Sequence, residues 1–181
     1  MKLAFVTGSA NKLKEAREIL APIVIEQLAL EVPELQGEPE EIARAKVHVA
    51  YQQARVDLFV EDTSLHCQAL KGLPGPYVKH FIGKLGAEGL WQILSAFPER
   101  RAVARTVVGF VIRGKVGIAA GEVSGTIVAP RGTSAFGFDP IFQPEGEKRT
   151  YAEMSAAEKN SISHRRKALE MLRQALEAHH G

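Results

Sequence analysis

Two consecutive acidic residues, Glu61 and Asp62, are the strongest candidates for chemistry in this sequence. They follow the apolar residues 58–60, which we expect in a buried strand, so a charge emerging there needs a partner, solvent or a metal ion. Open α/β sheets bind ligands at the carboxyl ends of their strands, and the expected strand ends in this pair. With Glu34 and Glu15, the pair predicts a Mg²⁺ site, because Mg²⁺ prefers oxygen ligands. Taken singly, each acidic residue is more often a solvated surface group.

The segment TGSANK, residues 7–12, indicates an anion-binding loop between a strand and a helix. Its small residues let backbone N–H groups approach a phosphate, the start of a helix adds partial positive charge, and Lys12 adds a full one. The segment lacks the spacing of a Walker A loop. An ordinary strand-to-helix turn with an exposed lysine is the competing interpretation, and the segment alone favours it.

Residues 130–167 interleave aromatic side chains with cations, a composition that suits a stacked base and neutralised phosphates. Non-specific RNA binding would use the same residue types, but the nearly neutral chain argues against it. Phe138 and Phe142 are also explained by core packing, and His164 by the start of a helix. The aromatic residues are Phe136, Phe138, Phe142 and Tyr151, and the cations are Lys148, Arg149, Lys159, Arg165, Arg166 and Lys167.

The elements that must position these residues alternate between strands and helices. Strands separated by helices, with one central hairpin, predict an α/β fold with a mixed sheet. The expected strands are at 2–7, 23–30 and 57–62, and at 102–113 and 115–128, which are joined at Gly114. The expected helices are one capped by Asn11, one starting near Glu40 and Glu41, one whose pattern includes Leu90, Ile93, Leu94 and Phe97, and one from about Ser163 with Leu169, Leu172 and Leu176 facing inward.

Length and composition place the chain among soluble proteins. Its 181 residues predict one domain, and the formal charge of +2 is too small for a protein that coats nucleic acid. Its single cysteine, Cys67, excludes an intramolecular disulfide and a multi-cysteine zinc site. The first apolar stretch covers only Leu3 to Val6, shorter than the roughly 7–15 residues of a signal-peptide core. We therefore expect a cytoplasmic protein with no membrane contact.

A series of segments, in one order along nearly the whole chain, resembles the inosine/xanthosine triphosphate pyrophosphatase family. Any one segment is weak, but the joint order is specific. The segments are TGSANK (7–12), LQGEP (35–39), VEDTSL (60–65), GLPGPYVK (72–79), SGTIVAPRG (124–132), FGFDPIFQPEG (136–146), TYAEMS (150–155) and EKNSISHRRKAL (158–169).

This resemblance implies a two-lobed α/β fold in which helices flank a long twisted mixed sheet beside a central cleft. It also implies a homodimer with no stable nucleic-acid partner. The implied reaction is hydrolysis of non-canonical purine nucleoside triphosphates, namely ITP, dITP or XTP, to the nucleoside monophosphate and pyrophosphate. The implied cofactor is Mg²⁺, with Mn²⁺ as a substitute.

The resemblance also implies residue roles. Asp62 matches the proton acceptor of the reaction, and it matches a metal-binding carboxylate together with Glu34. The matching substrate contacts are the phosphate loop of Thr7, Gly8, Ser9, Ala10, Asn11 and Lys12; Lys46, Thr63 and Lys79; the base-pocket segment of Phe136, Gly137, Phe138 and Asp139; and Lys159, His164 and Arg165.

Two positions depart from the family pattern. Ser9 stands where the phosphate loop usually has asparagine, and Phe138 stands where some members have tryptophan. Neither change removes a metal ligand or a cation, so they bear on fine specificity. Two alternatives stay open: a related nucleotide pyrophosphatase with a different base, and a nucleotide-binding module without catalysis.

Overall fold

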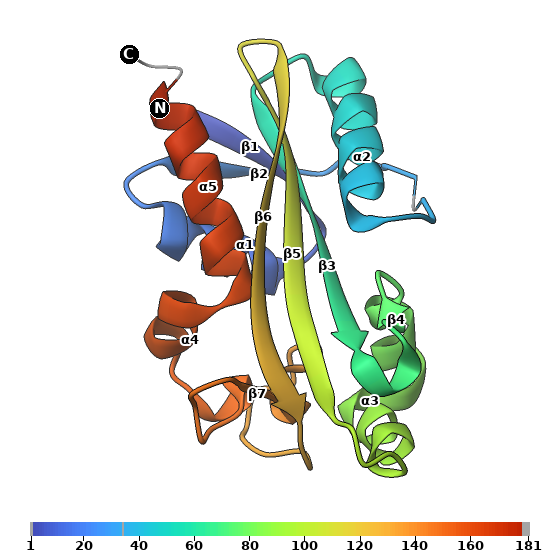
Figure 1. Ribbon diagram of the computed structural model, residues 1–181. Helices are drawn as coiled ribbons and strands as arrows, with labels where there is room; N and C mark the ends of the chain where they lie inside the picture. The colour runs from blue at the N-terminus through green and yellow to red at the C-terminus, as the bar shows by residue number, and fades with distance from the viewer. Residues whose placement is uncertain (1, 34, 179–181) are drawn as a thin grey trace. The chain divides into compact units, whose positions relative to one another are not determined.

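The chain forms an open, mixed seven-stranded sheet flanked by five helices in a computed structural model that describes residues 2–33 and 35–178 (Figure 1). The strand order is β2-β1-β3-β5-β6-β7, and β4 pairs with β3. The strands are β1 (Lys2–Val6), β2 (Val24–Leu28), β3 (Leu58–Cys67), β4 (Pro74–Gly75), β5 (Arg101–Ile112), β6 (Lys115–Ile127) and β7 (Phe142–Pro144). The helices are α1 (Ala10–Leu20), α2 (Pro39–Ala54), α3 (Val78–Ser95), α4 (Ala156–Ile162) and α5 (His164–Ala178).

The chain divides into two compact units, each built from separate stretches of sequence. The first unit contains the residues up to Asp62, Thr106–Gly121 and the residues from His164 onward. The second unit contains Thr63–Arg105 and Glu122–Ser163. Each unit has hydrophobic core residues of its own. In the described part of the chain, no helix combines the length and the apolar character needed to cross a membrane.

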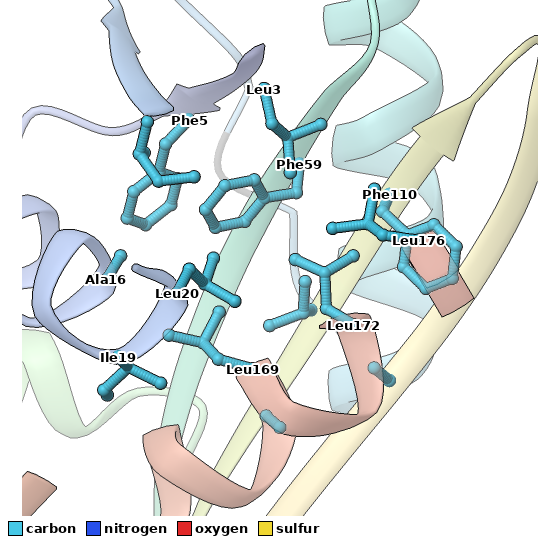
Figure 2. Packing of buried hydrophobic residues seen from close by; sticks show 14 of the residues in the cluster. Leu3, Phe5, Ala16, Ile19, Leu20, Phe59, Phe110, Leu169, Leu172 and Leu176 are labelled. Atoms are coloured by element: carbon cyan, nitrogen blue, oxygen red, sulfur yellow. The ribbon is translucent and has the colours of Figure 1, made fainter. Parts of the chain in front are cut away.

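In the first unit, the parallel strands β2, β1 and β3 have one face covered by α1 and α5. Alternate residues of a strand point to the same face, so Phe5 of β1 and Phe59 of β3 both reach this layer. Their rings stack with centroids 4.2 Å apart (Figure 2). Leu169 and Leu172 of α5 complete the layer (Figure 2). This packing ties the C-terminal helix to the first strand–helix unit of the chain.

Helix α2 packs on the other face of the same strands. Val47 of α2 lies in a cluster with Leu58 and Val60 of β3. The close approach of α2 depends on Gly109 of β5, because a methyl group there would lie 2.5 Å from the carbonyl oxygen of Ala43. Adjacent residues of β3 therefore face different helices, an arrangement that decides the surroundings of its acidic residues.

The second unit has its own core, formed by parts of β3, β5 and β6 with α3 and the segment around β7. Phe142 of β7 packs its ring against Phe138 and Tyr151, with centroids 5.9 Å and 5.2 Å away. Leu90 and Leu94 of α3 are buried in the same cluster. These contacts fix the aromatic segment that the sequence singles out.

The structure confirms the expected hairpin and the buried leucines of the C-terminal helix. Arg113 and Gly114 both have positive φ, 50° and 76°, as a type I′ turn between β5 and β6 requires. Three expectations are wrong. Ser9 caps α1, so Asn11 lies inside the helix. The third strand continues to Cys67. The helical pattern expected to run to Phe97 is cut short, because α3 ends at Ser95; Ile93 and Phe97 are 40% and 37% exposed.

Candidate active site

Glu61 and Asp62 lie inside β3, just beyond the last residue that β3 pairs with β1. That last pair is Val6 with Val60, so the acids follow directly after the end of β1. Because side chains of a strand alternate, Glu61 shares a face with Phe59 and Asp62 shares a face with Val60. The sequence placed both acids in one metal site, and the structure separates them onto two faces of the sheet.

Glu61 is held by cations from α1 and α5. The Nε and Nη2 atoms of Arg165 each donate to one oxygen of the Glu61 carboxylate, both at 2.8 Å. The Lys12 ammonium lies 3.2 Å from Glu61 Oε1. Arg165 also donates through Nη1 to Glu15. We call Lys12, Glu15, Glu61 and Arg165 the Glu61 cluster; it engages two of the four acids proposed for Mg²⁺ in ion pairs.

The charge of Arg165 is secured by these partners. Its side chain is 2% exposed and that of Glu61 is 0% exposed. Burial lowers the pKa of the guanidinium, but the charge and hydrogen bonds of Glu61, followed by those of Glu15, outweigh burial and raise that pKa above its ordinary value. Arg165 therefore stays a cation and links α5 to α1 and β3.

Asp62 pairs with Lys46 of α2 on the other face. Lys46 Nζ donates to Asp62 Oδ1 at 2.9 Å, and each side chain is 15% exposed. Within the described residues, Asp62 Oδ2 accepts no hydrogen bond. The pair thus combines a fixed carboxylate, an ammonium and an oxygen that can take a further ligand.

The predicted phosphate loop is a strand–loop–helix turn with a capped helix. The backbone N–H of Ser9 donates to Thr7 Oγ1 at 3.1 Å, and Ser9 Oγ accepts from the backbone N–H of Lys12 at 3.3 Å. The serine therefore performs the capping that an asparagine at this position would also perform. Gly8 and Ala10 are exposed, so the loop presents backbone to its surroundings.

The second unit holds a buried ion pair beneath aromatic rings. Lys159 Nζ lies 2.6 Å from Asp139 Oδ2, with side chains 7% and 6% exposed. The same ammonium lies 4.9 Å from the centroid of the Phe136 ring and 5.6 Å from that of Tyr151. We call Phe136, Asp139, Tyr151 and Lys159 the Lys159 cluster. Phe136 is half-buried, whereas Tyr151 is 1% exposed. An aromatic ring beside charged groups is of the kind that binds a nucleobase.

The structure brings together some predicted site residues and leaves others apart within their units. Lys46 meets Asp62, Lys12 meets the cluster that contains Arg165, and Phe136, Asp139 and Lys159 meet one another. His164 is the buried first residue of α5, Phe138 is in the core of the second unit, and Lys79 is exposed in the first turn of α3. Thr63 and Gly137 are half-buried in the second unit. Glu34 lies outside the described residues.

Sequence reasoning missed the ion-pair roles of Glu61 and Glu15 and the place of Tyr151 beside Lys159. The alternation of a strand was the available signal for Glu61, since consecutive residues cannot share a face. No local signal links Glu61 to Arg165, because the two are 104 residues apart.

A divalent cation is compatible with the Asp62 side of β3. Among the described residues, no three His, Cys, Asp or Glu side chains are grouped to hold a metal. Mg²⁺ is commonly held by one or two carboxylates together with substrate phosphates and water. The unused oxygen of Asp62 fits that mode, in which substrate completes the coordination.

Comparison with known proteins places the whole chain in one family. Residues 3–175 match the model of the Ham1 family. The Ham1 protein of Staphylococcus aureus has a TM-score of 0.86 at 26% identity, over 99% of this chain and 100% of that chain. A HAM1 protein of Coxiella burnetii gives 0.85 at 28%, over 98% and 99%. A nucleoside-triphosphatase, or dITP/XTP pyrophosphatase, of Mycobacterium abscessus gives 0.72 at 29%, over 95% and 98%. This chain therefore belongs to the Ham1 family.

Proposed function

We propose that this protein hydrolyses non-canonical purine nucleoside triphosphates, namely ITP, dITP and XTP, to the nucleoside monophosphate and pyrophosphate. The observation that carries the proposal is the Asp62–Lys46 pair, whose Nζ and Oδ1 atoms are 2.9 Å apart. Asp62 lies two residues past Val60, which pairs with the last residue of the strand leading into the phosphate loop. The similarity to the nucleoside-triphosphatase, or dITP/XTP pyrophosphatase, of Mycobacterium abscessus supports the same reaction.

The cations of the site bind the triphosphate and stabilise charge on the leaving pyrophosphate. Lys12 and the backbone N–H groups of residues 7–10 bind phosphate oxygens at the start of α1. Lys46 and Lys79 supply two further ammonium groups. Groups fixed before the reaction stabilise developing charge without having to reorganise during it. Lys46 is fixed in this way, because its ammonium donates a hydrogen bond to Asp62.

Asp62 accepts the proton of the attacking water. As the water oxygen forms a bond to the α-phosphorus, the bond from that phosphorus to the bridging oxygen breaks, and its electrons leave with pyrophosphate. The water proton passes to the Asp62 carboxylate. Mg²⁺, or Mn²⁺ in its place, bound by Asp62 and Glu34 with the phosphates, would supply positive charge to the polyphosphate.

The Lys159 cluster, with Phe138 in the same unit, selects the base. Hypoxanthine and xanthine carry an acceptor oxygen at C6, whereas adenine carries an amino donor. The Lys159 ammonium is a donor, so adenine would set donor against donor. A buried polar group without a partner costs about 1–3 kcal/mol, roughly 5- to 150-fold in affinity. Guanine is excluded by lack of space or of an acceptor for its 2-amino group.

Product analysis with ITP, XTP, dITP, GTP and ATP tests this proposal. We expect pyrophosphate and the monophosphate from the first three, with much lower catalytic efficiency for ATP and GTP. Equal efficiency for ITP and ATP would remove the donor argument. Release of orthophosphate in place of pyrophosphate would contradict the reaction itself.

The assembly and setting of the enzyme follow from the same proposal. We propose a cytoplasmic homodimer that acts on free nucleotides and binds no nucleic acid stably. Light scattering of the purified chain at several concentrations tests the dimer, and a monomer at all of them would refute it. Activity after treatment with a chelator, with and without added Mg²⁺ or Mn²⁺, tests the cofactor.

A further inference from the structure

The buried carboxylate of Glu61 is shared unequally between its two cations. Arg165 uses two N–H groups on it and directs a third toward Glu15. Lys12 contributes one contact, at 3.2 Å from Oε1. Arg165 is 2% exposed, whereas Lys12 is 22% exposed. Arg165 therefore neutralises Glu61 permanently, and Lys12 is the partner that can also reach a ligand.

Lys12 is poorly fixed by anything else. Its backbone N–H binds Ser9 Oγ, which places the Cα atom in the first turn of α1 but leaves the long side chain to rotate. Within the described residues, Glu61 is the one carboxylate that its ammonium meets. An ammonium has three donors, so the ion pair with Glu61 can orient it while donors stay available for phosphate oxygens. Pre-ordering a flexible lysine removes an entropy loss from the binding step.

We propose that Glu61 is a positioning residue: its buried carboxylate holds the Lys12 ammonium where the phosphate loop receives a polyphosphate. Glu61 itself touches no substrate and acts through Lys12. The inference rests on the proposed function in one respect, namely that residues 7–12 bind phosphates. It assigns adjacent acids separate tasks, because Asp62 serves the reacting water on the other face of β3.

Binding of inorganic tripolyphosphate to the full chain, measured by calorimetry without divalent metal, tests this role without requiring catalysis. We expect Glu61→Gln to weaken binding about 10-fold, since the ion pair that orients the lysine is lost. Glu15→Gln is the matched control, because it removes the other carboxylate from Arg165 and leaves Lys12 paired. Glu15→Gln should weaken tripolyphosphate binding less than about 2-fold, a difference no larger than that expected for independent sites.

A double-mutant cycle decides whether Glu61 acts through Lys12. In a Lys12→Met background, Glu61→Gln should change tripolyphosphate affinity by less than about 2-fold. The same 10-fold loss in that background would overturn the proposal, as would wild-type or tighter binding by Glu61→Gln alone. An equal loss in Glu15→Gln would show that the effect runs through Arg165, and would also overturn it.

Glu61→Asp covers the case in which Glu61→Gln does not fold. The shorter side chain keeps the charge for Arg165 but withdraws it from Lys12, so folded Glu61→Asp should also bind tripolyphosphate more weakly. Circular dichroism establishes that each variant is folded, and wild-type affinity in folded Glu61→Asp would contradict the proposal.

Turnover of ITP separates this inference from the proposed function. Glu61→Gln should raise KM about 10-fold while changing kcat less than about 3-fold, because Lys12 and not the reacting water is displaced. If the wild type binds tripolyphosphate but releases no pyrophosphate from ITP, the proposed function fails and the binding cycle still judges Glu61. If the wild type does not bind tripolyphosphate, the role of Glu61 fails with the phosphate loop.

Discussion

The Glu61 cluster and the Lys159 cluster both bury an acid–base pair, but they surround it differently. In the first unit, two carboxylates hold a guanidinium in a fork, and a partly exposed lysine lies at the edge. In the second unit, one lysine pairs with Asp139 while aromatic rings lie beside it. An arginine fork fixes geometry, whereas an ammonium near aromatic faces suits a flat ligand. The difference indicates phosphate chemistry in the first unit and base recognition in the second.

The largest expected effect separates chemistry from base recognition. Asp62→Asn should lower kcat about 10²- to 10⁴-fold, because the amide cannot accept the water proton. Affinity for ITP should persist, since the lysines remain. Steady-state release of pyrophosphate measures the first quantity, and calorimetry with ITP measures the second. Full activity in Asp62→Asn would place the proton acceptor elsewhere, and loss of ITP binding would show that Asp62 contributes mainly to substrate affinity.

Removing the lysine from each cluster should give opposite phenotypes. Lys12→Met should weaken tripolyphosphate binding about 10-fold and flatten its salt dependence, because an ammonium near phosphate is lost. Lys159→Met should leave tripolyphosphate binding nearly unchanged and lower the preference for ITP over ATP by roughly 5- to 150-fold. The two variants are compared in the same binding and kinetic assays. Similar phenotypes would erase the proposed division between the units.

Helix α5 carries Arg165, and the packing of this helix against the sheet depends on Gly121 of β6. A methyl group there would lie 2.4 Å from the backbone nitrogen of Ala168 and from the carbonyl oxygen of His164. Gly121→Ala should therefore destabilise the protein by about 1–3 kcal/mol. Gly83→Ala is the control, because it adds a methyl group to α3 with no atom within 4 Å and should stabilise that helix slightly. Urea denaturation of both variants measures the difference, and equal stabilities would contradict the close approach.

The smallest expected effect concerns the start of α4, which carries Lys159. A hydrogen bond from Arg149, followed by one from the backbone N–H of Ser155, lowers the pKa of Glu158 from 4.5 to about 2. A carboxyl group whose pKa is lowered by folding stabilises the protein at pH values above its pKa in the unfolded state. That stabilisation is lost as the pH falls from about 4.5 to 2. Glu158→Gln should show a slightly shallower loss of Tm over this range. Because Glu158 is exposed, solvent screening keeps the difference small. A steeper fall in Tm for Glu158→Gln than for the wild type would contradict this prediction.

Local patterns predicted those parts of the fold that neighbouring residues determine. The turn at Gly114 and the inward face of Leu169, Leu172 and Leu176 follow from spacing alone, and the structure confirms both. The helical pattern that included Ile93 and Phe97 ran past the end of α3, because periodicity shows that a helix has an apolar side but neither where the helix ends nor how much of that side is covered. The sequence predicted Asn11 as the cap of α1, whereas the structure has Ser9, because either side chain can cap a helix.

The candidate site was predictable in its residue types and less so in its pairings. The Asp62–Lys46 pair joins residues that the family resemblance had already selected. The Glu61–Arg165 pair depends on where α5 packs, which no local rule determines. The error of placing Glu61 with Asp62 came from ending the strand too early, since a strand that continues to Cys67 must send neighbours to opposite sides.

The register of β3 has a consequence for what mutation can do to this strand. Deleting or inserting a single residue of β3 before Phe59 would exchange the two acids between the layers of α1 and α2, and it would turn Phe59 away from Phe5 at the same time. A register shift that misplaced the carboxylates would therefore also remove an aromatic ring from the hydrophobic core. Variants with such a change in strand length should therefore fail to fold, and a folded enzyme with exchanged acids should not form.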